Sequence, residues 1–326
     1  MSRNEVIQMF IDKVISGEWH WLGYHFSPYR DGYEHFLIAS IIDSCIEIER
    51  IIPGFSKEFS EKLASYSGRE KYLPHYEQII QLLSELYVIR HLVSIPFEEP
   101  TFEIEPTIGG SKKNPEIGIR LANKEIFVEV KCREYVGHHN NRGNAAIEIP
   151  SRQDGVLELA KAIKKDSESI VLPRDNVIKD FLISADEKFV SFKANNPNAI
   201  TILVIVWDDF IYEPISALLN EASGLLTDNS FYKDGDSAHK FNNVDAVLVV
   251  RQSHQIVRAT RDELPVDGLE NPLDWGAIGQ VLPKALISIN PSEELNSYLC
   301  GILQAQDISE LQHAADYRPQ QFVLRI

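Results

Sequence analysis

Two short segments with alternating apolar and polar residues lie next to each other in the chain, at residues 116–122 and 125–132. A period of two is typical of a strand that buries one face. Only Asn123 and Lys124 separate the segments, and asparagine tolerates the positive φ that a two-residue hairpin turn requires. The sequence therefore predicts an antiparallel β-hairpin, and a one-residue slip of this hairpin would turn every side chain to the opposite face.

The two-residue turn would pair Ala122 with Glu125 and thereby set the register of the whole hairpin. One face would then be apolar, with the pairs Ile117/Val130, Ile119/Val128 and Leu121/Ile126. The other face would carry the pairs Glu116/Lys131, Gly118/Glu129 and Arg120/Phe127. Because glycine has no side chain, we expect open space beside Glu129 for a cation or a phosphate oxygen.

The polar face of this hairpin has the residues of a possible metal site. Carboxylates such as Glu116 and Glu129 are the oxygen ligands that hard divalent cations prefer, and a metal bound in this way can activate water and hold a phosphodiester. The alternative is that Glu129 and Lys131 point outward only because that face is wet. The same spacing of acid and lysine recurs at 186–188, in a predicted helix, where we interpret it as solvated surface.

The combination of Pro115-Glu116 with Glu129-Val130-Lys131 resembles the motif of the PD-(D/E)XK nuclease superfamily, which includes many restriction and repair nucleases. Many members also place a glutamate on the helix before the first core strand, and Glu85 matches that position. The resemblance covers about residues 76–207. It departs from the family at Glu116, where the first acid is usually an aspartate.

The resemblance implies an α/β fold with a restriction-endonuclease-like core, in which a central mixed sheet is flanked by helices. It implies that Mg²⁺, replaceable by Mn²⁺, is held by Glu116, Glu129 and the backbone carbonyl of Val130, with Glu85 supporting the metal or its water shell. Lys131 would orient the attacking water or offset charge in the transition state. Glu85 could equally be a solvated residue at the edge of its helix.

The implied reaction is hydrolysis of a phosphodiester bond that leaves a 5′-phosphate, in a restriction or defence role. DNA is the expected substrate, although these residues do not distinguish it from RNA. Because Glu116 replaces the usual aspartate, an inactive nuclease-like fold that acts as a binding or regulatory subunit is the alternative. A metal-independent hydrolase is disfavoured because no Ser, Cys or His stands in a nucleophile motif.

Hydrophobic periodicity predicts the other main elements and a division into three regions. We expect helices at 33–52, 76–92, 176–193 and 293–304, and strands at 101–106, 199–207, 244–250 and 282–290. We expect a helical N-terminal region (1–75), the nuclease-like core (76–207), and a C-terminal α/β extension (208–326) that continues the same sheet or forms a recognition or dimer surface. The segment 229–241 is predicted to be a polar loop.

The net charge of −16 disfavours a general nucleic-acid binder, because phosphate contacts dominate that kind of affinity. Residues 111–196 contain 15 basic and 13 acidic residues, whereas the rest of the chain contains 17 and 35. Within this less acidic segment, Lys112, Lys113 and Arg133 are candidate contacts for a substrate phosphate, or ordinary surface charges. An acidic body also suggests that productive DNA binding needs a homodimer or an accessory protein.

Three further features bear on location and binding. Cys45, Cys132 and Cys300 are widely spaced and form neither a disulfide framework nor a zinc motif, which fits a reducing cytoplasm. We find no candidate secretory signal or membrane span, so a membrane partner is not expected. The aromatic segment 18–26 could stack on bases, but a packed corner or subunit contact is the preferred interpretation. Paired histidines at 138–139 are interpreted as part of a loop over the substrate, without a metal.

Overall fold

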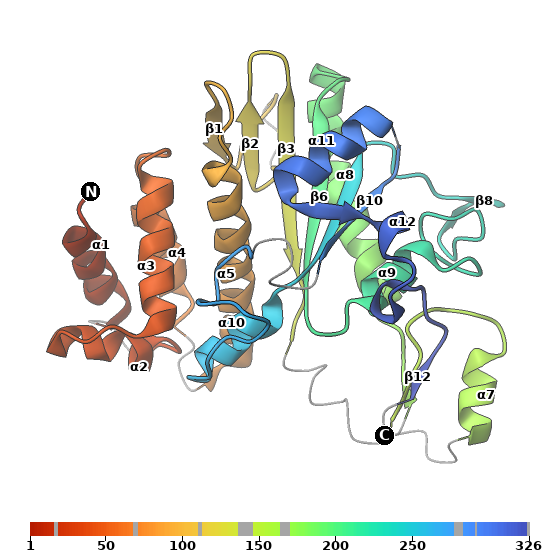
Figure 1. Cartoon of the computed structure of the whole chain (residues 1–326), viewed down its shortest axis with the longest axis horizontal. Helices are drawn as coiled ribbons and strands as arrows, with labels where there is room; N and C mark the ends of the chain where they lie inside the picture. The colour runs from red at the N-terminus through yellow and green to blue at the C-terminus, as the bar shows by residue number, and fades with distance from the viewer. Residues whose placement is uncertain are drawn as a thin grey trace.

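A seven-stranded mixed sheet forms the centre of the protein in the computed structural model (Figure 1). The structure describes all residues except 16–18, 68–70, 110–112, 136–145, 164–169, 277–282, 291 and 325–326. In spatial order the strands are β1 (Thr101–Ile104), β2 (Ile117–Arg120), β3 (Glu125–Cys132), β6 (Ile200–Trp207), β9 (Ala246–Arg251), β10 (Lys284–Ser288) and β11 (Ala305–Asp307). Strands β3, β6 and β9 are parallel to one another, while β1, β2 and β3 form an antiparallel meander. The expectation of an α/β fold with a central mixed sheet is confirmed.

Helices flank both faces of the sheet, as expected. One face is covered by α5 (Leu73–Ser94), α10 (Ser253–Thr260) and α11 (Glu293–Leu303), and the other by α8 (Asp175–Asn195) and α9 (Tyr212–Leu219). All eight residues of β6 are buried between these layers, which fits its nearly continuous apolar sequence. None of the helices in the described part of the chain combines the length and hydropathy that a membrane crossing needs.

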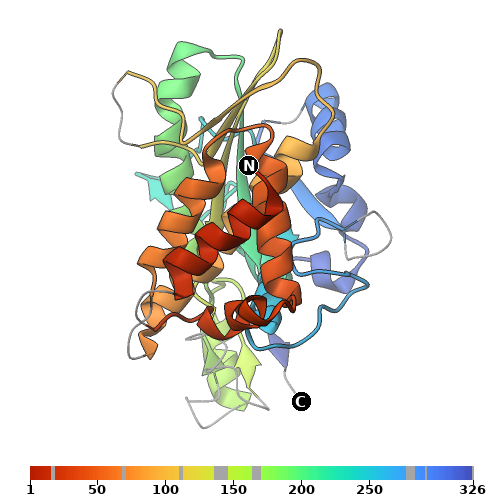
Figure 2. The same ribbon diagram turned by 90° about the vertical axis from the view of Figure 1, so that its left-hand side faces the viewer.

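The N-terminal helices form a layer on the outer side of α5 (Figure 2). They are α1 (Arg3–Phe10), α2 (Gly23–Phe26), α3 (Phe36–Glu49) and α4 (Phe55–Ser65). Helix α3 packs on α5, and the other three pack on α3. Smaller elements lie outside the main sheet: α7 (Val156–Ile163), a second sheet of β4 (Ile147–Glu148), β5 (Ile170–Val171) and β12 (Val323–Leu324), and α12 (Ile308–Leu311). The segment 229–241, predicted to be a polar loop, consists mostly of turns and irregular backbone, and it also contains a short hairpin of β7 (Lys233–Asp234) and β8 (Ser237–Ala238) that was not predicted.

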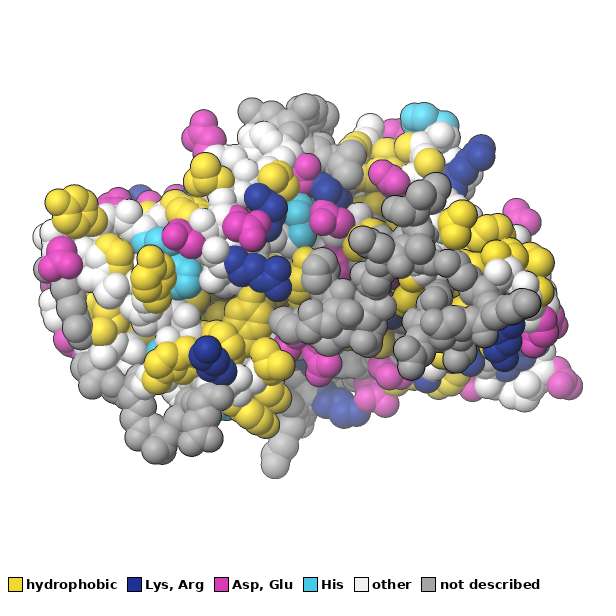
Figure 3. All heavy atoms as spheres, turned by 90° about the horizontal axis from the view of Figure 1, so that it is seen from below, with side chains coloured by type: hydrophobic (Ala, Val, Ile, Leu, Met, Phe, Trp, Pro, Cys, Tyr) yellow, Lys and Arg dark blue, Asp and Glu magenta, His cyan; other side chains and the backbone are white. Residues whose placement is uncertain are grey.

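The aromatic segment near the N-terminus combines buried and exposed rings. Leu22 and Phe26 are buried in the core, and Trp21 packs 5.0 Å from Tyr76 between ring centroids. Tyr24 is 70% exposed. Figure 3 shows hydrophobic and histidine side chains together at this end of the molecule. The segment therefore forms a packed corner with exposed rings at its surface, and the structure contains no partner that would test stacking or subunit contact there.

The hairpin of β2 and β3 forms, but its register differs by two residues from the predicted one. Ile117 pairs with Val128 and Arg120 pairs with Glu125. The cause is that the turn lies one residue earlier in the chain: Ala122 and Asn123 connect the strands, and the Leu121 amide donates a hydrogen bond of 2.8 Å to the Lys124 carbonyl. Neither Asn123 nor Lys124 adopts the positive φ that the predicted turn required. A shift of two residues keeps each side chain on its predicted face.

Gly118 pairs with Phe127 in the observed register, so the space predicted beside it is filled. A Cβ atom at position 118 would lie 3.0 Å from Cε1 of Phe127 and 3.1 Å from Cγ of Pro106. The prediction of an open site at Gly118 was therefore wrong. Just before β2, the Glu116 amide donates a hydrogen bond of 3.0 Å to the Val128 carbonyl, which places Glu116, instead of Gly118, near Glu129.

Replacing Gly118 with alanine tests this close packing. We expect Gly118→Ala to lower the free energy of unfolding by about 1–3 kcal/mol, because the Phe127 ring is fully packed and has no room to move. Urea unfolding measures this change. The matched control is Gly301→Ala in α11, where a Cβ would meet no neighbour and where we expect a gain of about 0.5–1 kcal/mol. Equal gains in both variants would contradict the close contact.

Candidate active site

A cavity of about 310 Å³ lies where β3 extends beyond the first residue of β2. Strand β2 begins at Ile117, opposite Val128, whereas β3 extends to Cys132. The wall of the cavity includes Glu85 of α5, Glu116, Val130 and Lys131 of β3, and Asp180 and Ser184 of α8. Polar groups of α5, β3 and α8 therefore line one cavity, beyond the first residue of β2.

Glu129 lies beside this cavity with its side chain fully buried and paired with two lysines. Nζ of Lys131 is 2.6 Å from Oε1 of Glu129. Nζ of Lys188 is 2.7 Å from the same oxygen and donates a hydrogen bond of 2.8 Å to Oε2. The contacts at Oε1 are ion pairs without the directionality of a hydrogen bond. Two ammonium groups thus neutralise one buried carboxylate.

The role of Lys188 was missed by the sequence analysis, which predicted solvated surface for residues 186–188. Helix α8 packs its apolar stripe on the sheet, and Lys188 follows the buried Ala185 by three residues and precedes the buried Phe192 by four. This spacing places it at the border of the buried face. It is the signal from which the contact with Glu129 could have been predicted. The neighbouring Glu187 instead pairs with Lys113 at the surface, at 2.5 Å.

Glu116 and Glu85 complete a group of three acidic side chains. Oε1 of Glu116 is 3.7 Å from Nζ of Lys188. Burial, together with the nearby charges of Glu85 and Glu129, raises the pKa of Glu116 to about 7. Burial also raises the pKa of Glu85, although Lys62 of α4, at 3.3 Å, opposes that shift. The structure therefore brings the four predicted side chains Glu85, Glu116, Glu129 and Lys131 into one region, and adds Lys62 and Lys188.

The donor set has a partial fit to a divalent cation. Among the described residues, no three His, Cys, Asp or Glu side chains are already arranged as a metal site. Glu116 and Glu129 nevertheless both face the ammonium of Lys188, which stands in for a cation at 2.7–3.7 Å from their oxygens. Their carboxylates are hard ligands that suit Mg²⁺ or Mn²⁺. Val130 lines the adjacent cavity. These residues fit a metal if Lys188 moves away.

The predicted phosphate contacts lie elsewhere or outside the described residues. Lys113 is engaged with Glu187, and Arg133 lines a small separate pocket beside Asp208. Lys112 and the histidines at 138–139 belong to segments that the structure does not describe. Of the predicted basic residues that lie in the described part of the chain, Lys131 is the one that lines the cavity.

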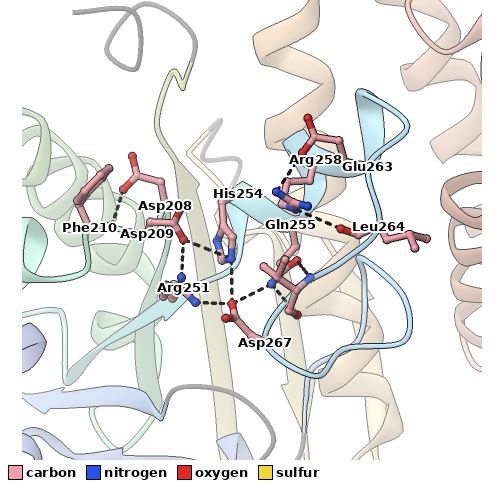
Figure 4. Close-up of polar contacts among 11 residues, drawn as sticks. Asp208, Asp209, Phe210, Arg251, His254, Gln255, Arg258, Glu263, Leu264 and Asp267 are labelled. Atoms are coloured by element: carbon pink, nitrogen blue, oxygen red, sulfur yellow. Dashed lines mark hydrogen bonds and ion pairs between the residues drawn. The ribbon is translucent and has the colours of Figure 1, made fainter. Parts of the chain in front are cut away.

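A second polar cluster lies at the carboxyl ends of β6 and β9 (Figure 4). Nε2 of His254 is 3.1 Å from Asp267 and 3.5 Å from Asp209, and Arg251 contacts both aspartates. Burial lowers the pKa of His254, and the charge of Asp209 opposes this shift. Its Nδ1 is buried and makes no hydrogen bond to any residue that the structure describes. These contacts attach the loop around Asp267 to the sheet, and the sequence analysis did not predict them.

The chain was compared with known proteins in three ways. A scan against protein-family models and searches of curated proteins and of solved structures found no match to the chain. We therefore base the proposed function on the side chains around Glu129.

The raised pKa of Glu116 makes its contribution to stability depend on pH. Between pH 4.5 and about 7 the folded state binds more protons at this carboxyl than the unfolded state, so the free energy of unfolding falls as the pH rises through this range. We expect Glu116→Gln to be more stable than the native chain by about 1–3 kcal/mol at pH 8, and to lose this advantage near pH 4.5.

Urea unfolding at both pH values, in EDTA, measures the difference. Glu187→Gln is the matched control, because Glu187 lies in an exposed ion pair and should give a nearly constant difference. A difference in the free energy of unfolding that is the same at both pH values for Glu116→Gln would contradict the raised pKa of Glu116.

Proposed function

We propose that this chain is a metal-dependent nuclease that hydrolyses phosphodiester bonds, with DNA as its substrate. The observation that supports this proposal is the convergence of Glu85, Glu116 and Lys131 on one cavity, with Glu129 beside it. The antiparallel β1–β2–β3 meander followed by the parallel strand β6 is compatible with a restriction-endonuclease-like core. We further propose a cytoplasmic location, because all three cysteines are free.

Each residue has a role that its position supports. Glu116 and Glu129 would hold Mg²⁺ or Mn²⁺, and the bound cation would supply positive charge at the scissile phosphate. Lys131 lines the cavity and would donate a hydrogen bond to the attacking water or to a phosphate oxygen. Glu85, whose pKa is raised by burial, would accept a hydrogen bond from that water.

A second function is favoured by a specific observation, the pairing of Glu129 with two lysines. Its carboxylate is fully buried, and both ammonium groups lie within 2.7 Å of Oε1. If these lysines replace the metal permanently, the fold would be an inactive relative of a nuclease that binds DNA or regulates a partner protein. Glu116 in place of the usual aspartate is compatible with this alternative.

Acidic charge outside the candidate site suggests that DNA binding is assisted. On the face seen in Figure 3, acidic and basic side chains are mixed around the middle of the molecule. The net charge of the chain is −16. Because phosphate repels such a body, we propose that a homodimer or an accessory protein completes the DNA-binding surface.

Replacing Lys131 tests the proposed activity. We expect Lys131→Ala to reduce cleavage by more than ~10²-fold, because it removes charge that acts on the transition state. Glu129 keeps Lys188 as a partner in this variant, so the fold should be retained. Cleavage of plasmid and of single-stranded DNA would be measured with Mg²⁺, with Mn²⁺ and with EDTA.

The matched control is Lys240→Ala, which removes an exposed lysine from a surface ion pair. It should cleave as the native chain does. Full activity of Lys131→Ala, or cleavage that persists in EDTA, would contradict the proposed mechanism. Absence of cleavage by the native chain with either metal would favour the inactive binding subunit.

A further inference from the structure

We propose that Lys188 is a built-in counter-cation of the metal site, and that a divalent cation binds by displacing its ammonium group from Glu116 and Glu129. This inference deepens the proposed function and rests on it. It assigns a positioning role to a helix residue outside the hairpin that carries the Glu129-Val130-Lys131 motif.

The ammonium group of Lys188 lies close to both carboxylates. Nζ of Lys188 lies 2.7 and 2.8 Å from the two oxygens of Glu129 and 3.7 Å from Oε1 of Glu116. It is thus the cation toward which both carboxylates point. Lys131 differs, because its short ion pair is with Glu129 and it lines the cavity where a phosphate would enter. A metal shared by the two carboxylates would need the space that Lys188 occupies.

The balance of charge is the second argument. A fully buried carboxylate beside other acids is unstable without a cation nearby. One ammonium group is enough to neutralise Glu129, yet two lie next to it. Lys131 can therefore keep Glu129 paired after Lys188 leaves.

The mobility of a lysine side chain is the third argument. Lys188 has a flexible four-carbon stem, and its side chain is 19% exposed, so the ammonium group can rotate toward water. On the same helix, Ser184 lines the cavity one turn before Lys188. Displacement therefore needs a change of rotamer and no movement of α8. The cost of breaking the ion pairs would weaken metal binding by the native chain.

Titration with Mn²⁺, followed through the electron paramagnetic resonance signal of free Mn²⁺, tests the inference without any activity readout. We expect Lys188→Met to bind Mn²⁺ at least about 10-fold more tightly than the native chain, because the ammonium group that faces both Glu116 and Glu129 no longer competes with the metal. Lys240→Met is the matched control, since it removes the same charge from an exposed ion pair and should leave the affinity unchanged.

The outcomes separate the inference from the proposed function. Measurable and equal affinities in the native chain and in Lys188→Met would overturn the displacement and leave a metal-dependent nuclease intact. No Mn²⁺ binding by either protein would overturn the proposed function, and the inference with it. Tighter binding by Lys188→Met but not by Lys240→Met would support both.

A second measurement on the native chain covers the case in which Lys188→Met does not fold. Acetylation by an N-hydroxysuccinimide ester, followed by mass spectrometry, reports how accessible each lysine is. We expect saturating Mn²⁺ to increase the acetylation rate of Lys188 by about 10-fold as its ammonium group leaves the ion pairs, and to leave that of Lys240 unchanged. An unchanged rate at Lys188 under conditions where Mn²⁺ binds would overturn the inference.

Discussion

The charge of the buried Glu129 carboxylate is the constraint on which the candidate site depends. An ionised carboxylate without access to water requires cations close to it. Lys131 provides one from the same strand, and Lys188 provides another from α8. Because Lys188 reaches across from the helix, its ion pair links α8 to β3. The buried apolar residues of α8, among them Phe189 and Phe192, also pack on the sheet, so the position of the helix does not depend on this ion pair alone.

The turn between β2 and β3 determines how this charge meets the cavity. The turn lies one residue earlier than predicted and shifts the pairing by two residues, so that β2 begins opposite Val128, while β3 continues to Cys132 with β6 as its parallel neighbour. The predicted turn would have paired Glu129 with Gly118. In the structure Glu116 and Glu129 instead both face Lys188, and a cavity lies at Lys131. The position of the turn thus determines which residue on the β2 side lies near Glu129.

Periodic patterns in the sequence predicted the elements better than the contacts between them. The expected strand at 125–132 has the bounds of β3, and the long apolar run at 199–207 became the buried strand β6. The faces of the hairpin were also right, since an even shift of register preserves them. The position of the turn was not predictable, because alternation does not depend on it. Lys188 was missed because its contact with Glu129 depends on how a distant helix packs.

The two candidate functions differ in which cation neutralises the glutamates around the cavity. In a nuclease it would be a divalent metal ion, and in an inactive binding subunit it would be lysine. Three glutamates lie among three lysines in the structure, with Glu85, Glu116 and Glu129 beside Lys62, Lys131 and Lys188, and Lys62 also lies 3.7 Å from Glu105. A divalent cation would add two positive charges to this group. In the proposed nuclease, this added charge would be offset when Lys188 rotates into water and a phosphodiester brings its negative charge to Lys131. The metal and the substrate would then each increase the affinity for the other. In the inactive binding subunit, Lys131 and Lys188 would neutralise Glu129 permanently, without metal or substrate.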